Sequence, residues 1–531
     1  MIHKEQFIIK RSKQIFISNI TEGRTSKISL ALAALSGILL FLSFPKFGTG
    51  ILAWIALVPL FYAINDKQGH ETLLIGFVAG FLYNLGIIYW ITYAIVKYGN
   101  LPVYTGIIAM FLMASYLAVY TMLFPYILTY LRRKDIPQVI SAPIIWTCLE
   151  YIKSNIFTGF PWENIAYSQY LNLKIIQISD ITGIYGMTFI IVFINAVVYD
   201  VLFIASQRKI KIIKITSALM IIFFIFFYGI IRIENIKKEN DRAKSIDIKL
   251  VQGNIDQSIK WSDQVRNETI NIYRNLSMHN VSEKKGLIIW PETAVPFYFQ
   301  DINDIHRLIL DVAISTNNWL LIGSPSYMRR NQEIQSANSA FLISPEGNIK
   351  GKYDKVHLVP FGEYVPLRKF LPFMSKIVVG IGDFEAGTGF YPLKMDEDKF
   401  GVMICYEGIF PEVGYRYKQT GVGFLVNITN DAWYGRTSAP YQHLSMVVFR
   451  SVENRLYVAR AANTGISAII DATGKISSNT KLFERTVLDG NVKIMNINTF
   501  YSKYGDIFTY ICLVVLIFLV MIPGGKGGYV R

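Results

Sequence analysis

The chain has 531 residues, of which 52% are hydrophobic and only 17% are charged. It is longer than one ordinary domain, and soluble domains usually contain about 25% charged residues, so this composition excludes an entirely soluble protein and indicates that a large part of the chain lies in lipid. The three cysteines show neither the pairing of a disulfide framework nor the spacing of a zinc site.

Eight apolar stretches divide the chain into a membrane part and a soluble part. They cover, in chain order, about residues 28–43, 50–65, 72–96, 103–131, 138–152, 176–206, 212–232 and 506–523. A helix needs about 20 residues to cross the hydrocarbon core of a bilayer, and most of these stretches reach that length with their flanks. The sequence therefore predicts a polytopic α-helical membrane domain of about eight spans, of which about seven fall within residues 28–232.

The distribution of Lys and Arg predicts how these helices are oriented. The N-terminal tail, residues 1–27, is basic, and so are the loops after the fourth and sixth spans, whereas the loops after the first, third and fifth spans carry few basic residues. Basic loops stay in the cytoplasm, so we expect both termini on that side. Residues 233–505 then lie outside the cytoplasm, and residues 506–531 supply the last span and a cytoplasmic tail.

The basic excess of the chain belongs to its membrane part. Residues 233–505 contain 32 Lys and Arg against 28 Asp and Glu, whereas the remaining segments contain 21 against 10. A nucleic-acid-binding domain would concentrate positive charge on its soluble surface. We therefore interpret the charge as a topology signal and expect no nucleic-acid partner.

Residues 233–505 have the pattern of an α/β domain. Short β-rich runs such as IDIKLVQGN, GLIIWPE and GVMICYE alternate with helical patterns at 263–280 and 301–316, and the turn signals PEGN and DATG separate neighbouring runs.

One strongly apolar segment, residues 370–382, lies inside this domain. It is either a core element or an arm that rests on the membrane surface, and the sequence leaves both interpretations open.

Reactive side chains follow three of the predicted strands. Glu292 follows the run IIWP, Lys355 and Glu363 begin and end the stretch KVHLVPFGE, and Cys405 ends the run GVMIC. A thiol attacks as its thiolate and needs a base, which a carboxylate at a desolvated strand end can supply. A neighbouring ammonium would stabilise the oxyanion that forms when a carbonyl is attacked. Together these residues make a complete acyl-transfer site, although each taken singly is more often a packed cysteine or a structural ion-pair residue.

Ordered motifs give the chain a resemblance to a known family. WPE ending at Glu292, KVHLVPFGE beginning at Lys355, and CYE beginning at Cys405 resemble the nitrilase superfamily. The longer strings GFPWENIAYSQ, LVQGNIDQSIKW and NITNDAWYG resemble its membrane-embedded branch, the apolipoprotein N-acyltransferase family. The resemblance runs over nearly the whole chain and implies a nitrilase-like α-β-β-α sandwich in residues 233–505, inserted before the last of about eight spans.

The resemblance also implies roles for particular side chains. Glu292 is expected to act as the general base, Lys355 to stabilise the oxyanion and Cys405 to be the nucleophile. Glu363 matches a second carboxylate that orients the lysine. His357 lies between them in sequence, but we expect it to be structural because the base in this family is a glutamate.

Five further residues match supporting or substrate-binding positions of the family. Tyr406 and Glu407 flank the nucleophile and are expected to be needed for full activity. Trp261 and Trp433 match aromatic positions that line the mouth of the site, and Asn338 matches a polar residue near it.

The reaction implied by the resemblance has two steps and needs no cofactor or metal. Cys405 attacks the sn-1 ester of a phospholipid donor, expected to be phosphatidylethanolamine, and keeps the acyl group as a thioester. The α-amine of an S-diacylglyceryl-cysteine at the N-terminus of an apolipoprotein then takes the acyl group, which gives a triacylated lipoprotein. The resemblance places this multi-pass protein in a bacterial cytoplasmic (inner) membrane, with its catalytic domain on the periplasmic side.

Two other functions remain open at this point. A membrane-tethered amidase or hydrolase of the same superfamily would use the same residues and pass the acyl group to water instead of an amine. A transporter or channel with an inactive extracytoplasmic domain would use the spans alone, although these contain few of the charges that mark ion pathways.

Overall fold

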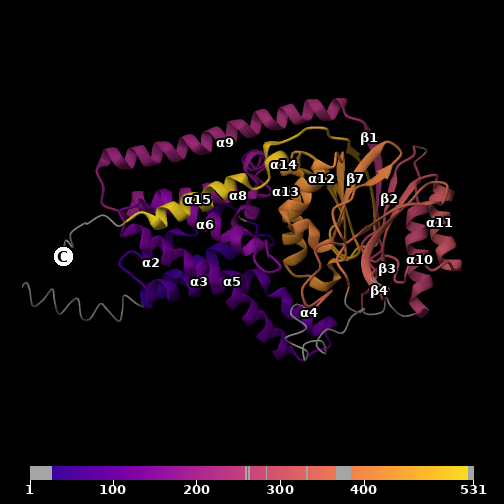
Figure 1. The fold of residues 1–531 in the computed structure, drawn as a ribbon, viewed down its shortest axis with the longest axis horizontal. Helices are drawn as coiled ribbons and strands as arrows, with labels where there is room; N and C mark the ends of the chain where they lie inside the picture. The colour runs from indigo at the N-terminus through magenta and orange to yellow at the C-terminus, as the bar shows by residue number, and fades with distance from the viewer. Residues whose placement is uncertain are drawn as a thin grey trace, which may run out of the picture.

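The computed structural model describes residues 27–523 apart from 49, 258–259, 261–262, 283, 331–332 and 366–383. Two parts lie side by side along the long axis of the molecule (Figure 1). One is a bundle of helices built mainly from the N-terminal half, and the other is a β-sandwich with helices on its outer faces. The C-terminal helices α14 (Phe500–Tyr504) and α15 (Ile507–Met521) return the chain from the sandwich to the bundle.

The helices of the bundle follow the expected apolar stretches. After a first helix at Lys27–Leu42 they are η1 (Gly50–Trp54), α2 (Val58–Ala63), α3 (His70–Ile88), α4 (Trp90–Tyr98), α5 (Val103–Arg132), α6 (Gln138–Asn155), η2 (Ile165–Gln169), α7 (Leu173–Ile176), α8 (Ser179–Phe203) and α9 (Arg208–Arg242). Of the described helices, α3, α5, α8 and α9 are long and apolar enough to cross a membrane. The other apolar helices are shorter, so the count of about eight spans stays a prediction.

Three stretches differ from the single spans that we expected. The second divides into η1 and α2, and the third divides into α3 and α4 at Tyr89. Helix α9 continues to Arg242 because residues 233–242 are rich in the helix formers Glu and Lys. The expected boundary between the membrane and catalytic domains at residue 233 therefore falls inside a helix, and the first strand begins at Ser245.

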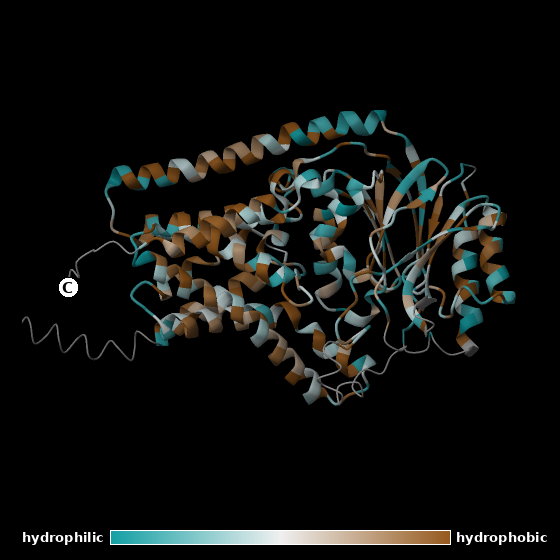
Figure 2. Ribbon diagram, in the orientation of Figure 1, coloured by the Kyte–Doolittle hydropathy of each residue, from teal (hydrophilic) through white to brown (hydrophobic). Residues whose placement is uncertain are grey.

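Helix α9 leaves much of its apolar surface uncovered. Its side chains Leu219, Phe223, Phe224 and Ile231 are each more than half exposed. Figure 2 shows the same pattern over the bundle, where hydrophobic residues predominate, whereas the end of α9 beside the sandwich is hydrophilic. Uncovered apolar surface of this extent is unfavourable in water and is removed by contact with lipid. The helical bundle is therefore the membrane-embedded part of the protein.

Two six-stranded sheets form the sandwich, in the orders β12-β1-β2-β3-β4-β5 and β11-β10-β9-β8-β7-β6. The strands are β1 (Ser245–Gln252), β2 (Leu287–Ile289), β3 (Trp319–Arg330), β4 (Glu333–Ile343), β5 (Ile349–Asp354), β6 (Leu393–Met395), β7 (Asp398–Ile404), β8 (Phe424–Thr429), β9 (Tyr457–Ala462), β10 (Ala468–Ile470), β11 (Ile476–Asn479) and β12 (Thr486–Lys493). Strands β1, β2 and β3 are parallel, and so are β7, β8 and β9.

Helices cover the outer face of each sheet, which gives the expected α-β-β-α layering (Figure 1). Helices α10 (Asp263–Met278) and α11 (Asp304–Thr316) pack on the first sheet. Helices α12 (Pro411–Gln419) and α13 (Ala439–Asn454) pack on the second sheet, on the side of the bundle. Because parallel strands place their carboxyl ends at one edge of a sheet, the residues after β2 lie at that edge of the first sheet, and the residues after β7 lie at that edge of the second sheet.

A buried ion-pair cluster joins the bundle to the sandwich. Asp180, at the start of α8, accepts hydrogen bonds from Arg455 at 2.8 Å, just after α13, and from Arg232 of α9 at 2.6 Å. Tyr228 of α9 donates to the same carboxylate at 2.6 Å. Asp180 and Arg455 are both buried, so the carboxylate neutralises positive charge that water cannot reach.

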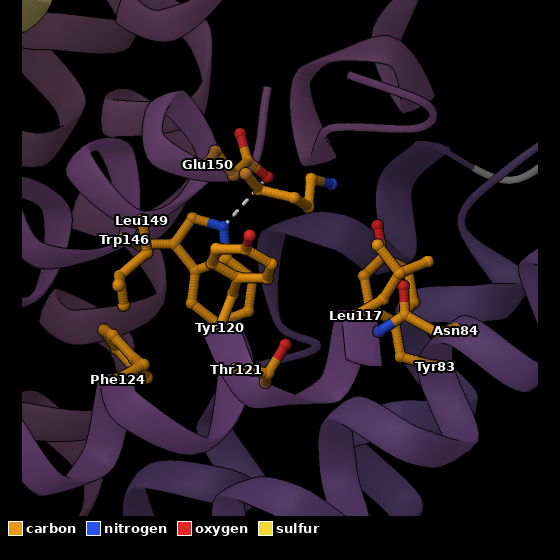
Figure 3. Close-up of a pocket in the computed structure, with 10 residues that line it drawn as sticks. Tyr83, Asn84, Leu117, Tyr120, Thr121, Phe124, Trp146, Leu149 and Glu150 are labelled. Carbon is orange, nitrogen blue, oxygen red and sulfur yellow. Dashed lines mark hydrogen bonds between the residues drawn. The ribbon is translucent and has the colours of Figure 1, made fainter. Parts of the chain in front are cut away.

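A second polar site lies inside the bundle (Figure 3). The carboxylate of Glu150 in α6 accepts hydrogen bonds from Trp146 Nε1 at 3.0 Å, the Ile165 backbone N–H at 2.8 Å and the Thr188 hydroxyl at 2.7 Å. The carboxylate borders a pocket between α3, α5 and α6, which the buried Lys153 also lines. Glu150 thus ties the segment GFPWENIAYSQ to two helices of the bundle.

Replacing Asp180 by Asn should destabilise the protein strongly, because the guanidinium of Arg455 would then be buried without a compensating charge. We expect the midpoint of thermal unfolding in detergent to fall by roughly 5–15 °C. The matched control is Glu239→Gln, which breaks the exposed ion pair with Arg242 and should leave the midpoint unchanged within about 1 °C. Equal midpoints for Asp180→Asn and the unmodified protein would contradict this role.

Candidate active site

Four of the residues predicted for the site meet at the ends of strands from both sheets. Glu292 lies just after β2, Lys355 follows β5, and Cys405 follows β7. The Lys355 ammonium lies 3.5 Å from Glu292 Oε1 and 2.8 Å from Glu363 Oε2. Cys405, Glu292 and Lys355 are each no more than 5% exposed. The site is therefore a desolvated cluster in which one ammonium is shared by two carboxylates.

Asn338 of β4 lies inside this cluster and connects the two acids. Its side-chain N–H group donates to Glu292 Oε1 and to Glu363 Oε1, both at 2.8 Å. The backbone N–H of Asn430 donates to the other oxygen of Glu292 at 2.9 Å. These bonds fix both carboxylates around the ammonium of Lys355. The polar residue expected near the site is thus in direct contact with the acids.

The charges of the cluster shift the pKa values of its members. Burial alone would lower the pKa of Lys355, but the carboxylates of Glu363 and Glu292 outweigh it and raise that pKa above its ordinary value. Burial raises the pKa of the Cys405 thiol, Glu292 adds to the effect, and Lys355 opposes it. At neutral pH the site therefore holds a charged lysine beside a neutral thiol, with a carboxylate close enough to influence both.

The nucleophile candidate sits in a strained turn that Glu407 braces. Cys405 has a φ of 51°, in the left-handed region, which costs a non-glycine residue about 1–2 kcal/mol. The Glu407 carboxylate accepts hydrogen bonds from the backbone N–H groups of Ile404 and Val356, both at 2.7 Å, and from the Tyr353 hydroxyl at 2.8 Å. Glu407 therefore joins the strand end that carries Cys405 to the one that carries the lysine.

The residues expected around the site occupy different positions. Tyr406 is buried and donates from its hydroxyl to the backbone oxygen of Gly159, in the bundle, at 3.3 Å. Trp433 is 40% exposed and contacts Tyr98 of α4 edge to face, with ring centroids 4.8 Å apart. Trp261 lies outside the described residues, as does the apolar segment 370–382.

His357 takes no part in the cluster, as expected. Its ring stacks on Phe410 with centroids 4.2 Å apart, and its Nε2 lies 2.8 Å from Glu412. Glu412 belongs to α12, on the outer face of the second sheet. His357 is therefore a packing and hydrogen-bonding residue that fixes the loop after β5.

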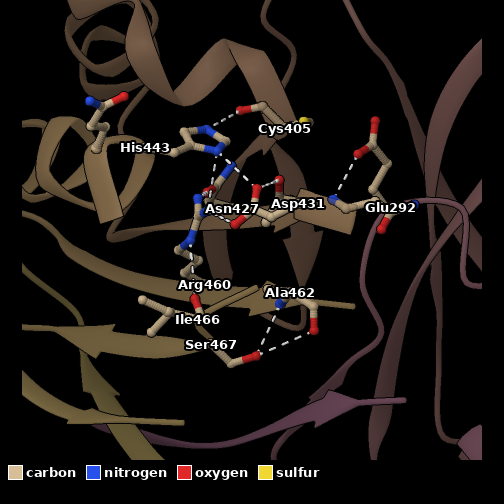
Figure 4. Close-up of polar contacts among 12 residues, drawn as sticks. Glu292, Cys405, Asn427, Asp431, His443, Arg460, Ala462, Ile466 and Ser467 are labelled. Atoms are coloured by element: carbon tan, nitrogen blue, oxygen red, sulfur yellow. Dashed lines mark hydrogen bonds and ion pairs between the residues drawn. The ribbon is translucent and has the colours of Figure 1, made fainter. Parts of the chain in front are cut away.

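Two groups of buried polar residues near Cys405 and Glu292 were not predicted from the sequence. Asp431, His443 and Arg460 form a network beneath Cys405 (Figure 4). Lys260 is fully buried, its ammonium lies 3.5 Å from the backbone oxygen of Glu292, and burial lowers its pKa to about 8. Lys260 and Asp431 lie in strings that were recognised by resemblance, whereas His443 and Arg460 lie in a helix and a strand with no local signal.

The arrangement has the parts that acyl transfer needs. It contains a thiol, a carboxylate that can take its proton, and an ammonium that can stabilise an oxyanion. Within the described parts of the chain, no three His, Cys, Asp or Glu side chains group as ligands for a metal ion.

The pKa of Cys405 can be followed by its rate of alkylation. Because burial and Glu292 raise this pKa, iodoacetamide should modify Cys405 slowly at pH 7, and the rate should rise about tenfold per pH unit to at least pH 9. Replacing Glu292 by Gln removes a negative charge, lowers the pKa of the thiol and should raise the rate at pH 8. Peptide mass spectrometry measures the rate, and a plateau below pH 8 would contradict the assignment.

Two family models match the chain. Residues 36–197 match the apolipoprotein N-acyltransferase N-terminal domain, and residues 249–500 match carbon-nitrogen hydrolase. Similar solved structures include an amidase from Nesterenkonia sp., which is 16% identical with a TM-score of 0.37, covering 50% of this chain and 95% of that one. A carbon-nitrogen hydrolase from Helicobacter pylori G27 is 15% identical with a TM-score of 0.37, at the same coverage of both chains.

Relatives of full length are also found. An apolipoprotein N-acyltransferase from Geobacter metallireducens is 42% identical over 486 residues, which cover 91% of this chain and 92% of that protein. One from Haemophilus influenzae is 31% identical over 92% of this chain and 93% of that protein, and one from Rickettsia prowazekii is 32% identical over 89% and 96%. Since these matches include both the helical bundle and the sandwich, the chain belongs to the apolipoprotein N-acyltransferase family.

Proposed function

We propose that this enzyme transfers an acyl group from the sn-1 position of a phospholipid to the N-terminal amine of an S-diacylglyceryl-cysteine apolipoprotein. The product is a triacylated lipoprotein. The observation that carries the proposal is the buried ammonium of Lys355, shared by Glu292 and Glu363 beside the thiol of Cys405, in a member of the apolipoprotein N-acyltransferase family.

In the first step the acyl group moves from the lipid to the enzyme. Glu292 takes the proton of the Cys405 thiol, and the sulfur attacks the carbonyl carbon of the ester. Lys355, which the neighbouring acids keep protonated, donates to the oxyanion of the tetrahedral intermediate. The carbon–oxygen bond of the ester breaks, Glu292 returns its proton to the leaving oxygen, and a lysophospholipid departs from the thioester.

In the second step the acyl group moves from the enzyme to the lipoprotein. The amine attacks the thioester carbon, Glu292 takes a proton from the nitrogen, and Lys355 again stabilises the oxyanion. The carbon–sulfur bond breaks and the thiol regains its proton from Glu292. Asn338 is suited to bind the amine, because its buried Oδ1 accepts no hydrogen bond within the described part of the chain.

The position of the site relative to the bundle supports substrates that are anchored in lipid. The backbone N–H of Asn430 donates to Glu292. The side chain of Trp433, three residues later, is partly exposed and contacts Tyr98 of α4 in the bundle. This loop therefore leads from the buried acids to the membrane part. We assign Trp433 to the mouth of the site, where its aromatic side chain would guide acyl chains.

The proposal includes a topology for the membrane part. Residues 1–27 form a cytoplasmic tail, residues 28–232 contain about seven spans, and residues 506–531 contain the last span and its tail. The catalytic domain, residues 233–505, then faces the periplasm of a bacterial inner membrane, where phosphatidylethanolamine is the expected donor. The basic loops carry this assignment.

Intact mass spectrometry after incubation with a phospholipid tests the first step. We expect the mass of one fatty-acyl group to be added at Cys405, and Glu292→Gln should slow its appearance by about 10²–10⁴-fold because the base is lost. Cys405→Ala should abolish the adduct, whereas Cys148→Ala, which removes a buried cysteine of α6, should leave it unchanged. An adduct that persists in Cys405→Ala would contradict the assignment.

The amidase alternative differs only in the acceptor. It predicts release of free fatty acid and no acylation of an added diacylated lipopeptide, and the family of the full-length relatives does not favour it. A transporter with an inactive domain would keep its biological activity in Cys405→Ala.

The proposed topology can be tested with single cysteines and an impermeant maleimide in spheroplasts, on a background in which Cys148, Cys405 and Cys512 are all replaced by Ala. Asp304→Cys lies in the sandwich and should react in intact spheroplasts, since Asp304 is 96% exposed. Lys209→Cys lies in the basic first turn of α9 and should react only after the membrane is opened. Labelling of both positions in intact spheroplasts would exclude the proposed orientation.

A further inference from the structure

A buried histidine holds the backbone of the proposed nucleophile. His443 of α13 is fully buried, and its Nε2 lies 3.1 Å from the backbone oxygen of Cys405. A carbonyl oxygen can only accept a hydrogen bond, so Nε2 must carry the hydrogen. The contact is thus a hydrogen bond from the His443 ring to Cys405, and it holds whether the imidazole is neutral or charged.

The other side of the ring is fixed by buried charged groups. His443 Nδ1 lies 3.0 Å from Asp431 Oδ1 and 3.2 Å from Arg460 Nη2. Arg460 also donates to Asp431 Oδ2 at 2.8 Å, and the Thr429 hydroxyl donates to Asp431 Oδ1 at 3.0 Å. A neutral ring accepts from the guanidinium at Nδ1, and a charged ring donates to the carboxylate. Either arrangement holds the ring in one orientation.

The hydrogen bond sets the direction of the peptide that follows Cys405. Figure 4 shows the carbonyl oxygen of Cys405 pointing to His443, with the sulfur on the opposite side of the residue, toward Glu292. Because a trans peptide is planar, the N–H of Tyr406 points away from that carbonyl oxygen and therefore away from His443. A backbone N–H on the thiol side can donate to an oxyanion that forms on a carbon bonded to sulfur.

We propose that His443 is a positioning residue, which Asp431 and Arg460 hold in place. Its hydrogen bond to the Cys405 oxygen keeps the N–H of Tyr406 directed toward the carbonyl of the acyl group under attack. The backbone at Cys405 is strained, with a φ of 51°, and would relax toward a more populated conformation unless hydrogen bonds such as the one from His443 held it. The inference rests on the proposed function, since it requires Cys405 to be the acyl-carrying nucleophile. It adds a residue that acts through the backbone of the nucleophile and touches no substrate.

Two substitutions of His443 separate this role from simple packing. The amide nitrogen of Gln can reach the position of Nε2 and donate to the Cys405 oxygen, whereas the shorter side chain of Asn reaches only the position of Nδ1. We expect His443→Asn to slow formation of the acyl-enzyme by about 100-fold and His443→Gln to stay within about tenfold of the unmodified enzyme. Alkylation of Cys405 by iodoacetamide forms no oxyanion and should change by less than about threefold in both variants.

The full-length enzyme is used throughout, with His306→Asn as the matched control. His306 is a buried histidine of α11 whose Nδ1 lies 2.9 Å from the backbone oxygen of Phe299, and its variant should form acyl-enzyme at the normal rate. A normal rate in His443→Asn would overturn the inference, and so would equal losses in the Asn and Gln variants or a parallel loss of alkylation. If the unmodified enzyme forms no adduct at Cys405, the proposed function itself fails.

Discussion

The buried ammonium of Lys355 is the interaction on which the rest of the site depends. It lies between Glu292 and Glu363, and both the lysine and Glu292 are buried, so the lysine stays charged only because both carboxylates compensate it. Burying this much charge would be unfavourable without the added hydrogen bonds from Asn338 to both acids. The same arrangement leaves Cys405 neutral at rest beside Glu292, the base that we propose.

The sandwich and the bundle serve this cluster in different ways. The sandwich brings together strand ends from two sheets, and Glu407 ties the end that carries Lys355 to the end that carries Cys405. The bundle approaches the same region through Tyr98 against Trp433 and through the backbone of Gly159 against Tyr406. A reaction between two lipid-anchored molecules needs both the sandwich and the bundle, because the reacting groups must be shielded from water and the entrance to the site must lie close to the bilayer.

Local patterns in the sequence predicted the acids, the lysine and the cysteine because each follows a strand or lies in an ordered motif. They could not predict that Glu407 would bind the backbone at Val356, or that His443 would bind Cys405, since these contacts join residues that are far apart in sequence. The length of α9 differs from the prediction for another reason. Residues 233–242 are polar, which predicts the end of a membrane span, but the helix formers among them continue the helix to Arg242. The apolar stretches predict the positions of the helices, but several of the helices that form are shorter than a bilayer requires.

The most direct test of the account follows the acyl group after it has reached the enzyme. Enzyme carrying a fatty-acyl group on Cys405 is isolated, mixed with a diacylated lipopeptide that has a free N-terminal amine, and both masses are measured over time. The account predicts that the enzyme loses the acyl group at the same rate as the peptide gains it, and that a peptide with a blocked amine leaves the thioester intact. Loss of the thioester as free fatty acid at a rate that does not depend on the peptide would contradict it.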